Sequence, residues 1–90
     1  MKYKRKTDVN HVEIIKELRA ANFTVVDLSA VGSGIPDLLV SRNKRTYLVE
    51  IKSTTGILNT LQKEFRKSWQ GKIYVVRYKT DVSYLNGNLP

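Results

Sequence analysis

The sequence contains no cysteine and a single histidine, His11, among its 90 residues. Without thiol groups the chain cannot form a disulfide bridge or a cysteine-based zinc site, and one imidazole alone cannot make a histidine-rich zinc site. Any metal ion held by this chain must therefore be bound mainly through oxygen atoms.

Long apolar runs and low-complexity segments are also missing. No stretch approaches the ~18–20 apolar residues that are needed to cross a membrane, and the N-terminal MKYKRKTD lacks the apolar core of a signal peptide. The sequence therefore predicts a cytoplasmic protein with no membrane partner.

Acidic residues are scarce, because eight Asp and Glu stand against 16 Lys and Arg, which gives a formal net charge of +8. Such an excess favours a polyanionic partner such as nucleic acid, although a lysine-rich solvated surface is the simpler explanation. The candidate phosphate contacts form three groups, which are Lys2, Lys4, Arg5 and Lys6, then Arg42, Lys44 and Arg45, and then Lys63, Arg66 and Lys67.

The remaining composition, with 41% hydrophobic and 27% charged residues, is that of an ordinary globular protein. We predict a single domain over residues 1–90, with a basic arm at 1–7 and a frayed tail at 80–90, in which a turn of helix near Val82 to Leu85 is the alternative. A chain this short buries only roughly 60–65% of the surface that its unfolded form exposes. Dimerisation would therefore help to stabilise it.

Hydrophobic periodicity predicts an α/β fold in the order αβββαβ, with a mixed sheet flanked by helices. The first helix begins at Asp8 or Asn10, the second follows Asn59, and the strands are expected at 23–28, 37–41, 46–52 and 73–77. In the second helix Leu61, Phe65 and Trp69 recur every four residues, which predicts a face packed in the core. The helix between the last two strands makes them a parallel pair.

The second and third strands form a predicted hairpin around Asn43-Lys44. Asp37 lies as far before this turn as Glu50 lies after it, so the two carboxylates should face each other across the ladder. Side-chain alternation places Lys52 on the same face as Glu50. Two like charges at this distance destabilise a sheet unless a cation lies between them.

This pair indicates a metal site. The carboxylates of Asp37 and Glu50, with the backbone carbonyl of Ile51, are hard oxygen ligands suited to Mg²⁺ or Mn²⁺. Such an ion can polarise a phosphodiester and acidify a bound water, while Lys52 orients that water or stabilises the developing charge. The competing hypothesis is a structural salt-bridge cluster, in which one lysine must satisfy two carboxylates.

These residues resemble a known signature. Pro36-Asp37 followed by Glu50-Ile51-Lys52 is similar to the motif of the PD-(D/E)XK nuclease superfamily. The wider pattern resembles the VRR-NUC nucleases, especially their short stand-alone phage members, and it consists of Gly34-Ile35-Pro36-Asp37-Leu38-Leu39-Val40, then Leu48-Val49-Glu50-Ile51-Lys52, then Leu58 with Gln62. The resemblance covers about residues 10–78.

The resemblance implies a restriction-endonuclease-like αβββαβ core and a metal-dependent DNA endonuclease. It further implies selectivity for branched DNA such as four-way junctions, a homodimer, no small-molecule organic cofactor, and a bacterial or phage-infected host cell.

At the level of single residues, the resemblance implies metal binding by Asp37 and Glu50, a catalytic role for Lys52 and a supporting role for Gln62. It also implies an acidic residue on the first helix, for which Glu13 is the best match and Glu17 the alternative. A simpler interpretation exists for two of them, because Asn10 with Glu13 and Asn59 with Gln62 both have capping-box spacing.

Two other functions stay open at this point. The first alternative is a noncatalytic DNA-binding module, or a nuclease subunit of a larger complex, that uses the carboxylates structurally. Metal-free RNA cleavage is the other alternative, and it would need His11 as its general base, since no second histidine is present.

Overall fold

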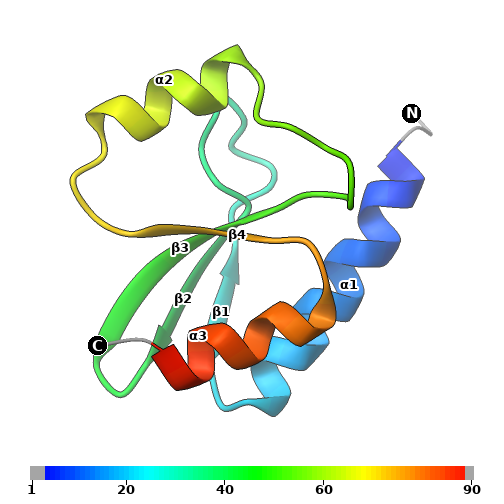
Figure 1. Ribbon diagram of the computed structural model, residues 1–90, viewed down its shortest axis with the longest axis vertical. Coiled ribbons are helices and arrows are strands. Elements are labelled where there is room, and N and C mark those ends of the chain that lie inside the picture. Colours follow the sequence, from blue (N-terminus) through cyan, green and yellow to red (C-terminus); the bar gives the residue numbers. More distant parts are fainter. Residues whose placement is uncertain (1–3, 89–90) are drawn as a thin grey trace.

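The computed structural model describes residues 4–88 and the side chains of residues 10–85. Figure 1 shows the elements in chain order. They are α1 (Lys4–Ala20), β1 (Thr24–Asp27), β2 (Leu38–Arg42), β3 (Arg45–Ile51), α2 (Thr60–Ser68), β4 (Ile73–Val76), the short 3₁₀ helix η1 (Lys79–Asp81) and α3 (Val82–Asn88).

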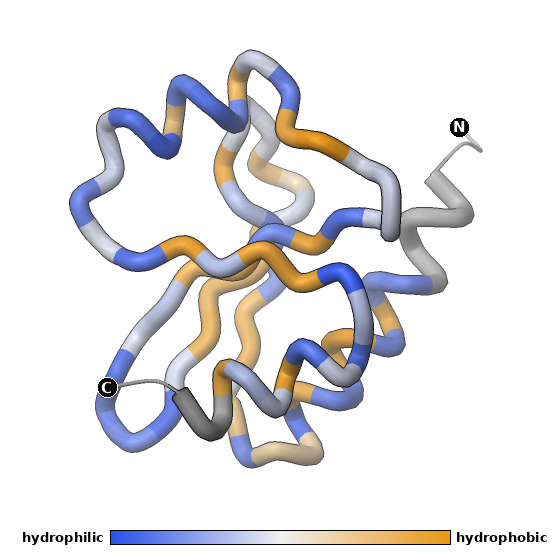
Figure 2. The backbone as a smooth tube through the Cα atoms, in the orientation of Figure 1, coloured by the Kyte–Doolittle hydropathy of each residue, from blue (hydrophilic) through white to orange (hydrophobic). Residues whose placement is uncertain are grey.

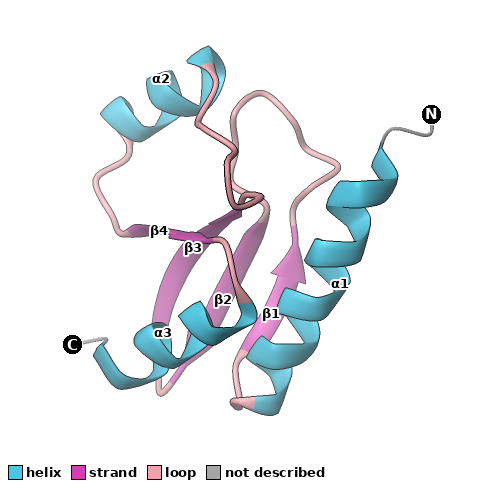
Figure 3. Cartoon of the chain, turned by 45° about the vertical axis from the view of Figure 1, so that its right-hand side comes forward, coloured by secondary structure: helices cyan, strands magenta, loops and turns pink. Residues whose placement is uncertain are grey.

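The four strands form one open mixed sheet in the order β1-β2-β3-β4 (Figure 3). The pairs β1–β2 and β2–β3 are antiparallel, whereas β3 and β4 run parallel. The predicted α/β class, the order of the first six elements and the parallel last pair are confirmed.

The β2–β3 hairpin turns at Asn43-Lys44, and both residues have positive φ angles, of 55° and 66°. Two consecutive left-handed residues make a type I′ turn, whose twist matches that of the strands it joins. Arg42 pairs with Arg45 beside the turn, and Leu38 pairs with Val49 at the other end of the ladder. This is the register that the sequence predicted.

The core lies on the face of the sheet that α1 and α3 cover (Figure 1). Ile14 and Leu18 of α1 are fully buried, as the 3.6-residue period requires. Val82 and Leu85 of α3 are each only 3% exposed. Figure 2 shows the hydrophobic segments concentrated in the strands and on the inner sides of these two helices.

The predicted frayed tail at 80–90 is therefore wrong for most of its length, since α3 extends through residue 88, whereas the alternative of a turn of helix near Val82 to Leu85 is confirmed. Val82 and Leu85 lie three residues apart and share one helical face, so burying them stabilises a segment whose own helix propensity is low. Residues 89 and 90 lie outside the described part of the chain.

The predicted basic arm at 1–7 is also wrong from Lys4 onward, because α1 begins there instead of at Asp8 or Asn10. Lysine and arginine are good helix formers, so a basic segment continuous with an amphipathic helix extends it by another turn. Asn10 and Glu13 consequently lie inside the helix and do not form its N-terminal cap. Residues 1–3 lie outside the described residues.

Helix α2 begins after the predicted cap Asn59, but none of its residues is buried. Leu61 is 58% exposed and Trp69, which follows the helix, is 44% exposed, so the predicted core face is wrong. Phe65 stacks on Trp69 with the ring centroids 5.5 Å apart. The helix stands away from the side of the sheet that α1 and α3 cover (Figures 1 and 3).

Within residues 4–88 we find no helix that combines the length and the apolar character needed to cross a membrane.

Candidate active site

The two candidate metal ligands meet where β3 ends. Glu50 is the next-to-last residue of β3 and is only 4% exposed, while Asp37 directly precedes β2. Continuing the β2–β3 register by one pair places the two residues opposite each other. The backbone N–H of Ile51 donates to Asp37 Oδ2 at 2.8 Å, which fixes the aspartate beside the glutamate.

The surroundings of Glu50 favour its protonated form. Burial is the largest cause, and repulsion by Asp37 with a proton shared between the two carboxyl groups adds to it. Together these effects raise the pKa of Glu50 from 4.5 to about 8, although the nearby cations Lys52 and Arg66 act in the opposite direction. Two carboxyl groups that share a proton leave an obvious place for a cation.

The structural salt-bridge cluster is not formed. Lys52 is half-buried just beyond β3, yet the ion pairs found among the described side chains join only His11 to Asp27 and Lys67 to Glu64. Lys52 influences Glu50 through space without contacting it. The buried glutamate is therefore not neutralised by a paired lysine, in the part of the chain that the structure describes.

Gln62 completes the cap of α2 and also contacts the candidate site. Its backbone N–H donates to Asn59 Oδ1 and its Oε1 accepts from the Asn59 N–H, both at 2.9 Å, which completes the capping box. Its Nε2 also donates to Glu50 Oε2 at 2.8 Å. The cap thus orients the side-chain amide, and the amide in turn holds one carboxylate oxygen of the site.

The loop before Asp37 packs tightly against the start of α2. Gly34 has a φ angle of +81°, and a side chain at this position would overlap the backbone carbonyl of Leu61. Gly32 has a similar φ of +75° but has open space around it. Glycine at 34 therefore permits both the left-handed turn and the close approach that brings Gln62 to Glu50.

The donor set is of the kind that suits a hard divalent ion with several water ligands, and binding of such an ion stays a prediction. Both carboxylates are present, Glu50 is deeply buried, and its charge has no paired cation among the described residues. The described residues contain no group of three or more acidic, histidine or cysteine side chains, so any ion here has at most two side-chain ligands of these kinds. The Ile51 carbonyl stays a predicted third donor.

Glu13 does not join this pair. It is exposed on α1, as is its alternative Glu17, and neither forms a three-acid group with Asp37 and Glu50. Helix periodicity explains this, because the face of α1 that reaches the sheet is occupied by His11, Ile14 and Leu18.

His11 is not placed as a general base for RNA cleavage. It is only 6% exposed, and its Nε2 lies 3.8 Å from Asp27 Oδ1, at the end of β1. Two hydrogen bonds from Ser29 lower the pKa of Asp27, so this carboxylate stays charged beside the imidazole. Its Nε2 is buried without a hydrogen-bond partner among the described residues, so the imidazole is closed to an RNA substrate.

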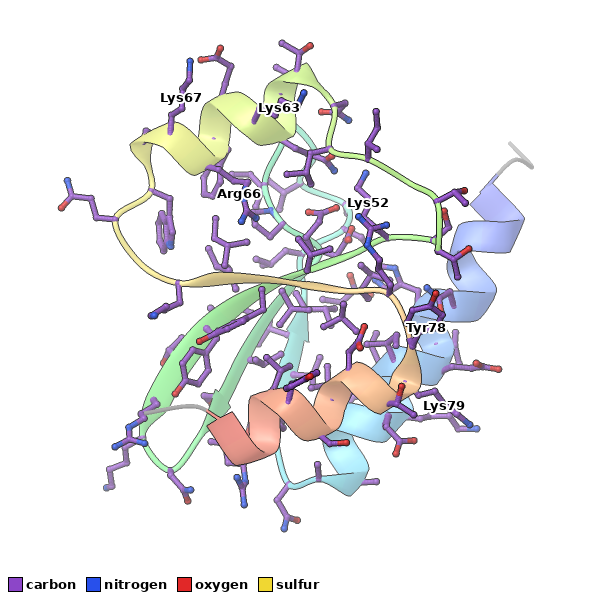
Figure 4. All side chains as sticks on the ribbon, viewed as in Figure 1. Lys52, Lys63, Arg66, Lys67, Tyr78 and Lys79 are labelled. Carbon is purple, nitrogen blue, oxygen red and sulfur yellow. The ribbon has the colours of Figure 1, made fainter. Side chains whose placement is uncertain are left out.

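The predicted basic residues divide between the two ends of the sheet. Arg42, Lys44 and Arg45 surround the hairpin turn, and the length of β3, roughly 20 Å at ~3.3 Å per residue, separates them from Glu50. Lys63, Arg66 and Lys67 belong to α2, at the same end as Lys52 (Figure 4). Lys2 lies outside the described residues, as do the side chains of Lys4, Arg5 and Lys6.

Arg66 differs from the surface position that the sequence suggested. It is half-buried and lines a small hollow together with Glu50 and Gln62. The signal for this was present, since Arg66 follows Gln62 by four residues and must share its helix face. It was missed because Leu61, Phe65 and Trp69 appeared to define the inner face.

Comparison of the chain with protein-family models, curated proteins and solved structures found no match in any of the three.

Proposed function

We propose that this protein is a metal-dependent DNA endonuclease in which Asp37 and Glu50 hold Mg²⁺ or Mn²⁺. The observation that carries the proposal is the burial of Glu50, 4% exposed, opposite a second carboxylate and without a paired cation among the described residues. Retaining two adjacent acids in this state is unfavourable for folding alone. The need to bind a divalent ion would explain why both acids are retained.

Each residue then has a distinct task. A bound divalent ion would supply the Lewis acidity that activates a phosphodiester and a water for hydrolysis. The Ile51 N–H orients Asp37, and Gln62 orients Glu50, so both carboxylates are held before an ion arrives. Lys52, on the same face as Glu50, brings a positive charge to the phosphate as negative charge develops there.

The fold and the charge of the chain support DNA as the substrate. The element order and the mixed sheet are compatible with a restriction-endonuclease-like core, and the sequence around the site resembles VRR-NUC nucleases. A net charge of +8 attracts a polyanion. We further propose that branched DNA, such as a four-way junction, is preferred and that two chains act together.

The experiment compares cleavage of labelled linear, single-stranded, flap and four-way-junction DNA in Mg²⁺, Mn²⁺ and EDTA. We expect metal-dependent cutting that Lys52→Ala reduces by roughly 10²–10³-fold. Lys72→Ala removes the same charge from an exposed position before β4 and is the matched control. Glu64→Gln, an exposed acid of α2, is the control for Glu50→Gln.

The result that would reject the nuclease is tight DNA binding with no cutting in either metal. The protein would then be a noncatalytic DNA-binding module. Cutting that persists in EDTA would also contradict the proposal, because it would make the carboxylate pair dispensable.

A further inference from the structure

Among the described residues, Arg66 is a half-buried arginine with an unsatisfied hydrogen-bond donor. Its Nη1 is buried and has no hydrogen-bond partner among the residues that the structure describes. The other arginines show what is usual, because Arg77 donates to two backbone carbonyls, of Ser53 and Gly56, and Arg42 lies over the ring of Phe23. A buried donor without an acceptor is unfavourable and calls for a reason.

The guanidinium of Arg66 lies beside the carboxylate site. With Glu50, Gln62, Gly34 and Pro36 it lines the hollow between α2 and the end of β3. Figure 4 shows Arg66 on the side of α2 that faces the sheet, whereas Lys63 and Lys67 extend from the opposite side of the helix. Glu50, which lines the same hollow, is already hydrogen-bonded by Gln62 and forms no ion pair with Arg66.

The chemistry of the guanidinium indicates what Arg66 can bind. Arg66 is a cation that forms no ion pair among the described residues, and a phosphate is an anion with two non-bridging oxygens. A guanidinium presents planar paired donors that fit two phosphate oxygens, which a lysine cannot do.

We propose that Arg66 is a phosphate-binding residue of the site and that it contacts the non-bridging oxygens of the DNA phosphate held next to Asp37 and Glu50. This contact requires α2 to move outward, because the hollow has no room for a water molecule in this structure and Nη1 is closed to solvent. The inference rests on the proposed function for the identity of the substrate. The unpartnered donor and its place beside Glu50 are independent of that function.

The first test measures binding of inorganic phosphate in EDTA, where no cleavage takes place. Phosphate should raise the thermal midpoint of the wild type, and Arg66→Ala should lose that shift while Lys72→Ala keeps it. Arg66→Lys retains the charge but not the paired donors, so it should lose most of the shift. The phosphate-free midpoint of Arg66→Ala should stay at or above that of the wild type, because the variant removes an unsatisfied buried donor.

The second test measures the affinity for four-way-junction DNA by fluorescence anisotropy, also in EDTA. Arg66→Ala should weaken binding by roughly 10- to 100-fold, the loss expected for charge-assisted hydrogen bonds. The inference is overturned if the wild type shows no phosphate shift, or if Arg66→Ala and Arg66→Lys retain it. A lower phosphate-free midpoint in both variants would likewise overturn it, by showing that Arg66 holds α2 in place.

The two proposals fail separately. If the wild type cuts no DNA in Mg²⁺ or Mn²⁺ but Arg66→Ala abolishes the phosphate shift, the nuclease is rejected and Arg66 remains the phosphate ligand. If the wild type cuts DNA and Arg66→Ala binds phosphate normally, the opposite conclusion holds.

Discussion

At the scale of single residues, Glu50 connects the stability of the protein to its chemistry. Its carboxyl group is buried opposite Asp37 and bonded by Gln62, so the folded protein binds a proton there up to about pH 8, whereas the unfolded chain releases it near 4.5. Between these two values the folded state carries more bound protons than the unfolded state. The free energy of unfolding must therefore fall as the pH rises through this range.

Glu50→Gln should remove that dependence. Glutamine has the shape of the protonated acid, so in EDTA at pH 8 to 9 the variant should be more stable than the wild type by about 1–3 kcal/mol. The thermal midpoint of a domain of this size rises roughly 4–8 °C for each kcal/mol. Near pH 4.5 the two midpoints should converge, as thermal unfolding followed by circular dichroism would show.

Glu64→Gln is the control, since Glu64 is exposed and its charge is solvated. Adding Mn²⁺ at pH 8 should stabilise the wild type and not Glu50→Gln. Equal differences between Glu50→Gln and the wild type at both pH values would show that the glutamate is charged in the folded protein throughout.

At the scale of elements, the position of α2 depends on Gly34. A side chain at 34 would overlap the Leu61 carbonyl, so Gly34→Ala must displace the start of α2 and with it Gln62 and Arg66. We expect cleavage of four-way-junction DNA to fall by more than roughly 10-fold, because small misplacements of a site cost large factors in rate.

Gly32→Ala provides the matched comparison. Its φ of +75° imposes a left-handed strain similar to that at Gly34, about 1–2 kcal/mol, but no atom lies within reach of the added methyl group. Gly34→Ala should therefore lose more stability than Gly32→Ala in thermal unfolding, because its methyl group also displaces α2, and only Gly34→Ala should lose most of its cleavage rate. Equal cleavage rates would mean that the contact with Leu61 does not position the site.

Local rules were sufficient for the parts of the fold and site that depend on neighbouring residues. The spacing of Asp37 and Glu50 about the Asn43-Lys44 turn gave the register, and Asn59 with Gln62 gave the start of α2. These local rules therefore predict the position of both candidate carboxylates from the sequence alone.

Tertiary contacts decided the rest. The burial of Val82 and Leu85 turns the expected frayed tail into α3, and nothing in NGNLP itself indicates this. The periodic apolar pattern of α2 predicted a buried face that does not exist, because the helix turns Gln62 and Arg66 inward toward Glu50 and leaves Leu61 exposed. A buried charge can override an apolar pattern when a functional site requires it.

At the scale of the whole molecule, the small size and the exposed apolar side chains of the α2 region bear on the proposed dimer. A chain of 90 residues has a limited core, and Ile57, Leu61 and Trp69 stay exposed in the single chain. We expect static light scattering at micromolar concentration to give about twice the mass of one chain. A mass of one chain, with junction cleavage intact, would show that a single chain is sufficient.

The hydrogen bond from Gln62 to Glu50 gives α2 a second significance. This helix buries none of its own residues, and its described contacts with the rest of the fold include the hydrogen bond from Gln62 to Glu50 and the close approach of Gly34 to Leu61. The acid that would receive an incoming cation is thus also the anchor of the helix that carries Arg66. Binding of a cation at Glu50 would therefore be coupled to the position of α2, so the position of this helix would report whether the site is occupied.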